Sequence, residues 1–292
     1  RDAHKGTFGK AMIAAGSVNY AGAAYLAGAA ATRVGAGLVT LAIPQLLHPI
    51  LAVKLVEATY LLLPHSTGVL NADAVDVLTE ALPGYRALLI GPGLGQDKET
   101  VAFVHKLLGI QQTVKGRIGF QHGIETAPRP TALPPLVVDA DGLNALAQVN
   151  RWWTYLPTNS VLTPHPGEMA RLMKTEAIPA DRIAVASAKA TEWGQIVVLK
   201  GAHTVIAAPD GRITVLPFAN SGLATAGTGD VLAGCIVGLL AQGLATFDAA
   251  VCGTYLHGLA GHKVAQKLGP AGMVAGDLLP ELPCAISQVS RM

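Results

Sequence analysis

The stretch NSGLATAGTGDVLAGCIVGLLAQGL, residues 220–244, decides the fold of this chain, because it joins a glycine-rich turn to an apolar helix. Gly227 and Gly229 permit a tight turn that a Cβ atom would obstruct. The first N–H groups of the following helix have no partner inside it, and such groups bind phosphate. Asp230 falls in this first turn. A carboxylate beside a bound anion is electrostatically costly, so we expect it to remove a proton or to hold a metal. A simple N-terminal cap is the alternative interpretation of Asp230.

The composition indicates a compact α/β enzyme that acts on a small molecule. The 292 residues are 51% hydrophobic and 14% charged, with abundant glycine and few aromatic side chains, and they suffice to bury a large core. The formal net charge is only +2 and no run of Lys or Arg occurs, which argues against nucleic acid as a partner. The most apolar segments, 21–31 and 231–244, are shorter than the roughly 20 residues of a membrane span.

The three cysteines indicate a reducing compartment. Cys235, Cys252 and Cys284 are isolated, odd in number and set in apolar helical contexts. Such cysteines are typical of buried free thiols rather than of disulfides or a metal site. We therefore expect a cytoplasmic protein.

Apolar runs of strand length alternate with helix-length segments, which predicts a mostly parallel sheet covered by helices on both faces. The predicted strands are 11–15, 38–43, 59–63, 87–90, 136–139, 161–163 and 196–200. The predicted helices include 22–34, 72–81, 99–108, 180–193 and 247–267. Segments 204–208 and 212–216 flank Pro-Asp-Gly and predict a β-hairpin near the C-terminal end, with two or three helices after it. We expect a single three-layer α/β/α domain over residues 1–292, with a surface excursion at 110–135.

Two more glycine-rich turns follow predicted strands, at the strand ends where open α/β sheets bind ligands. In AAGSVNYAGAA, residues 14–24, small residues let a helix approach either a ligand or only the sheet. In IGPGLGQ, residues 90–96, the glycines do not match the dinucleotide pattern GxGxxG, because Pro92 removes a donor and the third glycine comes too early. A structural turn remains an equal alternative there.

Paired carboxylates follow another predicted strand, in VVDADGLNAL at residues 137–146. Asp139 and Asp141 could each hold Mg²⁺ through water, or cap the helix that begins near Gly142. We expect Asp141 to be the cap. Both functions stay open for Asp139.

The next two predicted strands end in residues that could meet a ligand. His165 stands between two prolines in LTPHPGEMARL, residues 162–172, and this rigid setting favours a functional histidine. Glu168 enters the first turn of the following helix, where it could also complement the helix dipole. Lys200 ends a buried strand, so it could bind phosphate as a point charge or extend to solvent. The P-loop pattern GxxxxGK[ST] is absent, so a nucleotide would bind through TAGTGD at 225–230 and KGAHT at 200–204.

In this order, the segments resemble the ribokinase-like superfamily and, within it, the ADP/ATP-dependent NAD(P)H-hydrate dehydratases. The resemblance covers nearly the whole chain, through HKGTFGKAMIAAGS, GAGLVTLAIP, IGPGLG, VVDADGLNAL, LTPHPGEMARL, VVLKGAHTVIAAPDG, ATAGTGDVLAGCIVGLLAQGL and YLHGLAGHKVAQKLG. The string TPHPGE distinguishes this branch from the similar vitamin kinases, which usually have Asn in place of His165.

The resemblance implies a reaction. Such enzymes use ADP, or ATP in eukaryotic members, to dehydrate the S form of 6-hydroxylated NADH or NADPH, and they release NAD(P)H, phosphate and, from ADP, AMP. Asp230 would then deprotonate the 6-hydroxyl for attack on the terminal phosphorus. The amides of Gly227, Thr228 and Gly229 would stabilise charge on the transferring group.

The resemblance also implies the binding residues. Those for the nucleotide are Lys200, Gly201, Ala202, His203, Thr204, Asn220 and Gly229. Those for the hydrated dinucleotide are Ala23, Ala24, Gly91, Gly93, Gly95, His165 and Asp230. Glu168 matches the acidic residue of the kinases' NxxE motif, which implies a part in a Mg²⁺ network through water.

The chain departs from its relatives at two places: LPFANSG at 216–222 replaces their usual NPTGNPG, and the 110–135 excursion is unusual. Many relatives carry an upstream epimerase domain, which this chain could have had as well. Relatives form homo-oligomers of four or more subunits, and we expect a homo-oligomer here. A ribokinase-like kinase for a vitamin precursor is one alternative function. A binding protein without chemistry is another, although the presence of Asp230 argues against it.

Overall fold

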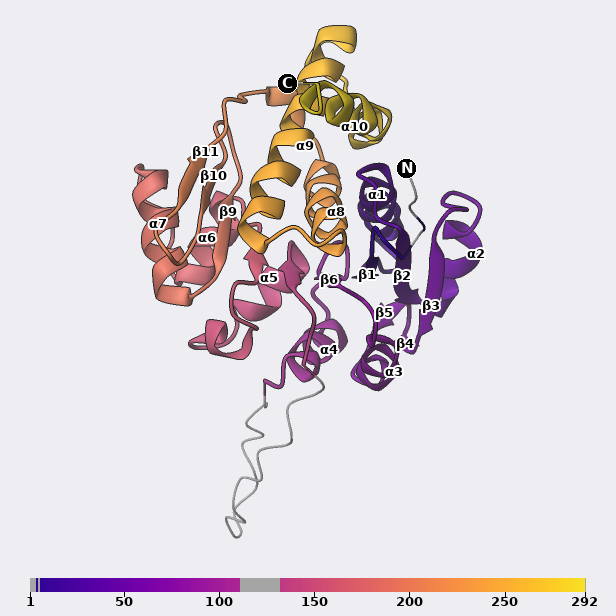
Figure 1. The fold of residues 1–292 in the computed structure, drawn as a ribbon. Helices are drawn as coiled ribbons and strands as arrows, with labels where there is room; N and C mark the ends of the chain where they lie inside the picture. The colour runs from indigo at the N-terminus through magenta and orange to yellow at the C-terminus, as the bar shows by residue number, and fades with distance from the viewer. Residues whose placement is uncertain (1–3, 5, 111–131, 292) are drawn as a thin grey trace.

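The computed structural model describes residues 4, 6–110 and 132–291 and arranges them in three layers, with a sheet between two sets of helices (Figure 1). The predicted excursion at 110–135 therefore lies mainly outside the described residues. No helix within the described ranges is long and apolar enough to cross a membrane.

Within these described residues, nine strands form the central sheet in the order β11-β10-β9-β8-β7-β6-β1-β2-β3. The neighbours from β9 to β3 pair in parallel, whereas β10 pairs antiparallel with both β9 and β11. A short antiparallel ladder, β4 (His65–Ser66) with β5 (Val69–Leu70), stands apart. The strands of the main sheet are β1 (Lys10–Ala14), β2 (Leu38–Pro44), β3 (Thr59–Leu63), β6 (Ala87–Ile90), β7 (Leu136–Val138), β8 (Val161–Leu162), β9 (Ile196–Leu199), β10 (Val205–Ala207) and β11 (Ile213–Val215).

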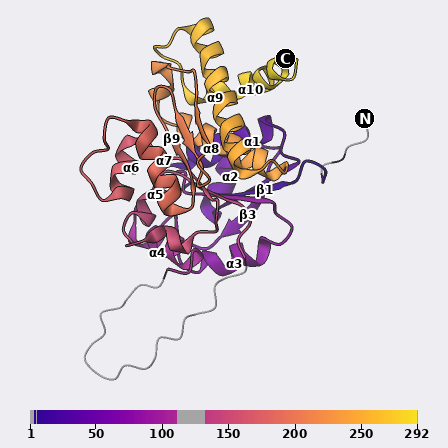
Figure 2. The same cartoon turned by 60° about the vertical axis from the view of Figure 1, so that its left-hand side comes forward.

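Helices cover both faces of the sheet, as Figures 1 and 2 show. One face carries α1 (Ala21–Arg33), α2 (His48–Leu51), α8 (Thr228–Ala241), α9 (Thr246–Leu268) and α10 (Ala275–Val289). The opposite face carries α3 (Ala74–Ala81), α4 (Lys98–Leu107), α5 (Asp141–Leu146), α6 (Pro166–Met173) and α7 (Arg182–Trp193). Short 3₁₀ turns are η1 (Gln45–Leu47), η2 (Trp152–Tyr155) and η3 (Ser221–Ala224).

The apolar runs of the strands explain this architecture. Successive side chains of a strand point to opposite faces. In β1, Ile13 packs under α8 and its neighbours, while Met12 packs under the helices of the other face, and both are fully buried. The predicted mostly parallel sheet, its helical layers and its antiparallel hairpin are confirmed. The hairpin forms one edge of the sheet, and α8, α9 and α10 follow it in the chain.

The prediction of three buried thiols is wrong for two of them. All three cysteines are free, and Cys235 is buried in α8, but Cys252 and Cys284 are exposed. The reason is that α9 and α10 each keep an outward face in solvent, which apolar sequence context alone did not reveal.

Candidate active site

The turn before α8 presents backbone N–H groups to a cavity. Gly227 is the N-cap with a φ of 91°, a left-handed conformation that favours glycine. The first bond that closes the helix joins the Val231 N–H to the Gly227 carbonyl at 3.2 Å. The N–H groups of Gly229 and Asp230 therefore have no acceptor among the described residues. Gly229 and Thr228 line a cavity of about 510 Å³. Of the three predicted amides, that of Gly229 is free, whereas the Thr228 N–H donates to the Thr225 carbonyl at 3.4 Å, and an anion site at this turn stays a prediction.

His257 supports this turn from α9, and sequence reasoning did not find it. Its Nε2 lies 2.9 Å from the Thr228 carbonyl oxygen, which can only accept, so Nε2 carries the hydrogen and donates the hydrogen bond. Burial lowers the pKa of His257 to about 4, although the bond to Thr228 opposes this, so the ring is neutral at pH 7. The Thr228 carbonyl and the Gly229 N–H belong to one planar trans peptide and point in opposite directions. His257 thereby helps to aim the Gly229 N–H.

We expect acid to destabilise the folded chain through His257. Its pKa is about 4 in the folded state against 6.5 ordinarily, so the unfolded chain takes up the proton first as the pH falls. The stabilisation is complete above pH 6.5 and is lost toward pH 4, with a loss of about 2 kcal/mol between pH 7 and pH 5. Urea unfolding of the wild type and of His257→Gln at both pH values measures it.

The exposed His262 of the same helix supplies the control, His262→Gln. The stability difference between wild type and His257→Gln should shrink by about 2 kcal/mol from pH 7 to pH 5. An unchanged difference would show that His257 does not titrate in this way.

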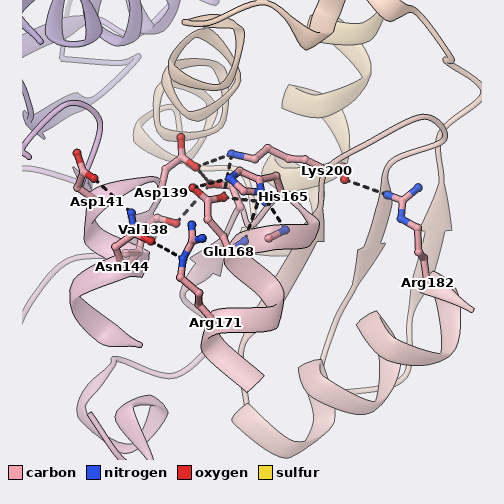
Figure 3. A network of polar contacts seen from close by, with 11 residues as sticks. Val138, Asp139, Asp141, Asn144, His165, Glu168, Arg171, Arg182 and Lys200 are labelled. Atoms are coloured by element: carbon pink, nitrogen blue, oxygen red, sulfur yellow. Dashed lines mark hydrogen bonds and ion pairs between the residues drawn. The ribbon is translucent and has the colours of Figure 1, made fainter. Parts of the chain in front are cut away.

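Lys200 lies in a cluster of carboxylates at the ends of β7, β8 and β9 (Figure 3). Its Nζ is 2.8 Å from Asp139 Oδ1 and 3.6 Å from Glu168 Oε2. The Lys200 side chain is 18% exposed and that of Asp139 only 1%, so Lys200 does not extend freely into solvent. Burial lowers the pKa of Lys200, but Asp139 and Glu168 outweigh burial and hold the pKa above its usual value.

Of the two functions left open for Asp139, the structure excludes the helix cap, and the link to Mg²⁺ through water stays a prediction. Besides Lys200, its Oδ1 accepts a hydrogen bond from the Thr163 hydroxyl at 2.7 Å. It caps no helix, because the N-cap of α5 is Ala140. Asp139 is the buried counter-charge of Lys200.

Asp230 lies beside this cluster in the first turn of α8. A Cβ atom built on its neighbour Gly229 would be 3.4 Å from Lys200 Nζ and 3.8 Å from Asp139 Oδ2. Burial raises the pKa of Asp230 to about 7, with a further rise from Asp139 and a partial offset from Lys200. Asp230 is not the N-cap of the helix, so the cap interpretation is wrong. A carboxyl group with a pKa near neutral is suited to general base catalysis.

His165 is the N-cap of α6. Its Nδ1 accepts hydrogen bonds from the N–H groups of Gly167 and Glu168, at 3.0 and 3.3 Å, and Glu168 Oε2 accepts one from the His165 N–H at 2.7 Å. Burial lowers the pKa of His165, while Glu168 raises it and Lys200 lowers it. The ring is half exposed. The two prolines thus fix a helix cap, and contact with substrate through the other side of the ring stays a prediction.

The side chains around Glu168 do not form a metal cage of their own. Among the described residues, no group of three His, Cys, Asp or Glu side chains could hold an ion. Glu168 already accepts a hydrogen bond from the His165 N–H. Asp139 is paired with the Lys200 ammonium, which would repel a second cation bound beside it. These residues therefore do not fit a directly bound Mg²⁺ ion. The predicted link from Glu168 to Mg²⁺ through water stays a prediction.

The glycine turns that follow β1 and β6 are joined to each other by hydrogen bonds. The Gly16 N–H donates to the Pro92 carbonyl and the Ser17 hydroxyl to the Gly93 carbonyl, each at 2.8 Å. A Cβ atom on Gly91 would lie 1.9 Å from the Asp139 carbonyl oxygen. Close backbone packing thus accounts for Gly91.

Small residues of α1 contact these turns. A Cβ atom on Gly93 would lie 2.6 Å from the Cβ of Ala23, and one on Gly16 would lie 3.1 Å from the Cβ of Ala24. Packing explains these positions as well. The predicted contact of Ala23, Ala24 and Gly93 with a dinucleotide, like that of Gly91 and Gly95, stays a prediction.

Asp141 links the second turn to α5 and α6. Its Oδ2 accepts the Gly95 N–H at 2.9 Å, and its Oδ1 accepts from Asn144, which in turn accepts from Arg171 (Figure 3). The prediction that Asp141 caps α5 is wrong, because Asp141 is the first helical residue and its carboxylate points to the Gly95 turn. A sequence pattern alone cannot show such a contact 46 residues away.

Most of the predicted nucleotide residues surround one cavity. Those that line it are Lys200, Gly201, Ala202, Thr204, Asn220 and Gly229. His203 is not among them, since its ring Nδ1 lies 3.2 Å from the Leu216 carbonyl. The Asn220 side chain accepts from the Gly222 N–H and donates to the Gly261 carbonyl, both at 2.9 Å, so it holds the loop rather than offering a free amide.

The NAD(P)H-hydrate dehydratase profile matches residues 11–284 of the chain. The chain belongs to the NAD(P)H-hydrate dehydratase family. It is 46% identical to the bifunctional NAD(P)H-hydrate repair enzyme Nnr of Moorella thermoacetica, over 99% of this chain and 51% of that protein. The chain thus spans about half the length of curated relatives that it matches.

Solved structures agree with this family and with the predicted fold. An ADP/ATP-dependent NAD(P)H-hydrate dehydratase from Bacillus subtilis, co-crystallised with ATP and Mg²⁺, matches with a TM-score of 0.76 and 31% identity, over 99% of this chain and 93% of that one. A ribokinase-like superfamily protein from Enterococcus faecalis matches with a TM-score of 0.78 and 26% identity, over 98% and 89%. The predicted dehydratase family and ribokinase-like fold are confirmed.

Proposed function

We propose that this chain is an ADP-dependent (S)-NAD(P)H-hydrate dehydratase that restores NADH and NADPH from their hydrates. One observation carries the proposal. A carboxyl group with a pKa of about 7, Asp230, belongs to the turn whose N–H groups have no acceptor among the described residues, and Gly229 of this turn lines the same cavity as Lys200. This arrangement supports a base, an anion site and a cation acting together.

The proposed reaction follows from these groups. The Asp230 carboxylate takes the proton of the substrate 6-hydroxyl, and the hydroxyl oxygen forms a bond to the terminal phosphorus of ADP while the bond to the bridging oxygen breaks, which releases AMP. The N–H groups of Gly229 and Asp230 stabilise the charge on the transferring group. The ring nitrogen then supplies the electron pair as phosphate leaves C6, and loss of a proton from C5 restores the dihydropyridine.

The cavity supports binding of the nucleotide by the segment from Lys200 to Thr204 together with Gly229. We assign the hydrated dinucleotide to the neighbouring glycine turns, His165 and Asp230. The Bacillus relative was co-crystallised with ATP and Mg²⁺, which supports a nucleotide bound together with Mg²⁺. Bound in this way, Mg²⁺ would neutralise phosphate charge.

Turnover of purified S-hydrate tests the proposal. Incubation of the chain with (S)-hydrated NADH, ADP and Mg²⁺ should restore the absorbance of NADH, with one AMP and one phosphate released for each NADH formed. A vitamin-precursor alcohol supplied with ATP should not be phosphorylated. Absence of NADH with ADP intact would contradict the dehydratase, and phosphorylation of the alcohol would favour the kinase alternative.

Three expectations from the sequence stay predictions: assembly into a homo-oligomer, an upstream epimerase domain and a cytoplasmic location. The bifunctional relative is about twice the length of this chain, which supports the second of them.

A further inference from the structure

Arg182, the first residue of α7, holds the segment that follows β9. Its guanidinium donates to the carbonyl oxygens of Leu199 at 2.8 Å, Lys200 at 3.1 Å and Ala202 at 2.6 Å. Arg182 forms no ion pair with a carboxylate among the described residues, and its Nε is buried without a partner there. One cation thus donates to three carbonyl groups at the end of β9 and in the loop after it, and Figure 3 draws the bond to Lys200.

Because a peptide group is planar, each bonded carbonyl also fixes the direction of the N–H group in the same peptide. The peptide bonds are planar and none in the described residues is cis, so each carbonyl points opposite to the N–H of the next residue. The N–H paired with the Leu199 carbonyl, that of Lys200, donates to Pro164 at 2.9 Å. The N–H paired with the Ala202 carbonyl, that of His203, donates to Phe218 at 2.8 Å.

The third peptide differs from these two. Its carbonyl is that of Lys200, and its N–H, that of Gly201, has no acceptor among the described residues. The next peptide, between Gly201 and Ala202, has the same pattern of a bonded carbonyl and a free N–H. The Thr204 hydroxyl donates to the Gly201 carbonyl at 3.0 Å, and the Ala202 N–H has no acceptor among the described residues. Gly201 and Ala202 both line the cavity. The loop therefore offers two adjacent free donors, and the carbonyl behind the first is held by a cation.

We infer that Arg182 is a positioning residue for the nucleotide: it turns the Gly201 N–H away from itself and polarises it as a donor for a phosphate oxygen of a nucleoside diphosphate. A cation bonded to a carbonyl strengthens the donor at the other end of the same peptide. Arg182 acts through the backbone and contacts no nucleotide atom itself. The inference rests on the proposed nucleotide site and adds a residue to it.

Binding of ADP and of adenosine to Arg182→Met and Arg182→Lys tests the inference. Calorimetry should show ADP binding weakened by about tenfold to a hundredfold in Arg182→Met, the loss expected for a hydrogen bond to a charged group. Adenosine, which lacks phosphate, should bind with little change by ligand-observed NMR. Arg182→Lys keeps the charge but loses the fork of donors, so its loss should be intermediate. Lys189→Met, on the same helix, is the matched control.

Kinetics separate positioning from a general structural effect. The KM for ADP should rise in Arg182→Met with a smaller change in kcat, and thermal melting checks that each variant is folded. If Arg182→Met does not fold, Arg182→Lys carries the test with an expected loss of about tenfold. Unchanged ADP binding, or equal losses for ADP and adenosine, would overturn the inference.

These outcomes are distinct from those for the proposed function. A wild-type chain that restores NADH while Arg182→Met binds ADP normally would refute the inference alone. A chain that shows the expected loss of ADP binding but forms no NADH would refute the dehydratase proposal alone.

Discussion

Asp230→Asn is expected to lower kcat by about a thousandfold and to leave ADP binding intact. The amide has nearly the shape of the carboxyl group but cannot accept a proton at neutral pH, and a positioned base contributes about 10² to 10⁴ in rate. The proposed anion site consists of backbone N–H groups, which the substitution does not change. Steady-state formation of NADH and calorimetry with ADP measure the two effects. Near-normal turnover would refute the assignment of Asp230 as the base.

The pH dependence gives an independent check on Asp230. Its pKa of about 7 predicts that kcat/KM of the wild type rises with pH through 7, because only the ionised carboxylate can take the proton. The contribution of Asp230 to the stability of the folded state changes with pH in the opposite direction. A raised carboxyl pKa stabilises the folded state below the ordinary value of 3.8 and loses that contribution as the pH rises through about 7. Asp230→Asn should therefore be at least as stable as the wild type at pH 8, which excludes unfolding as the cause of lost activity.

The fold could be predicted largely from the sequence because local patterns determine most of it. Buried parallel strands read as continuous apolar runs, and the hairpin is marked by Pro-Asp-Gly at 209–211. Strands β9, β8, β7, β6 and β1 are successive neighbours in the sheet, so their carboxyl ends lie side by side. For that reason the polar segments after them meet at one edge, as the sequence order indicated.

The partners of the site residues could not be predicted in the same way. Asp139 and Lys200 are 61 residues apart, and Thr228 and His257 are 29 apart, so each pair forms only when the layers pack. Arg182 lies in none of the sequence motifs that indicated the site. The sequence identified which residues bear chemistry, while the choice between cap, ion pair and ligand contact depended on tertiary distances.

Lys200→Met should destabilise the folded chain by about 3 to 5 kcal/mol, the cost of removing one partner from a buried ion pair. Asp139, which is 1% exposed, would keep only the Thr163 hydroxyl as a partner for the oxygen that Lys200 now contacts. Removal of the ammonium, which lowers the pKa of Asp230, should also move the rise of kcat/KM to higher pH. Urea unfolding without ligand measures the first effect, and the pH profile measures the second.

The double variant Lys200→Met, Asp139→Asn separates stability from ligand binding. Replacing the unpaired carboxylate by a neutral amide removes the buried charge, so most of the lost stability should return. ADP binding should be weaker than in the wild type in both the single and the double variant, because phosphate lacks the Lys200 cation. If the double variant were as unstable as Lys200→Met, the ion pair would not account for the loss. If it bound ADP like the wild type, Lys200 would serve only to neutralise Asp139, and the nucleotide would depend on the backbone donors of Gly201, Ala202 and Gly229 alone.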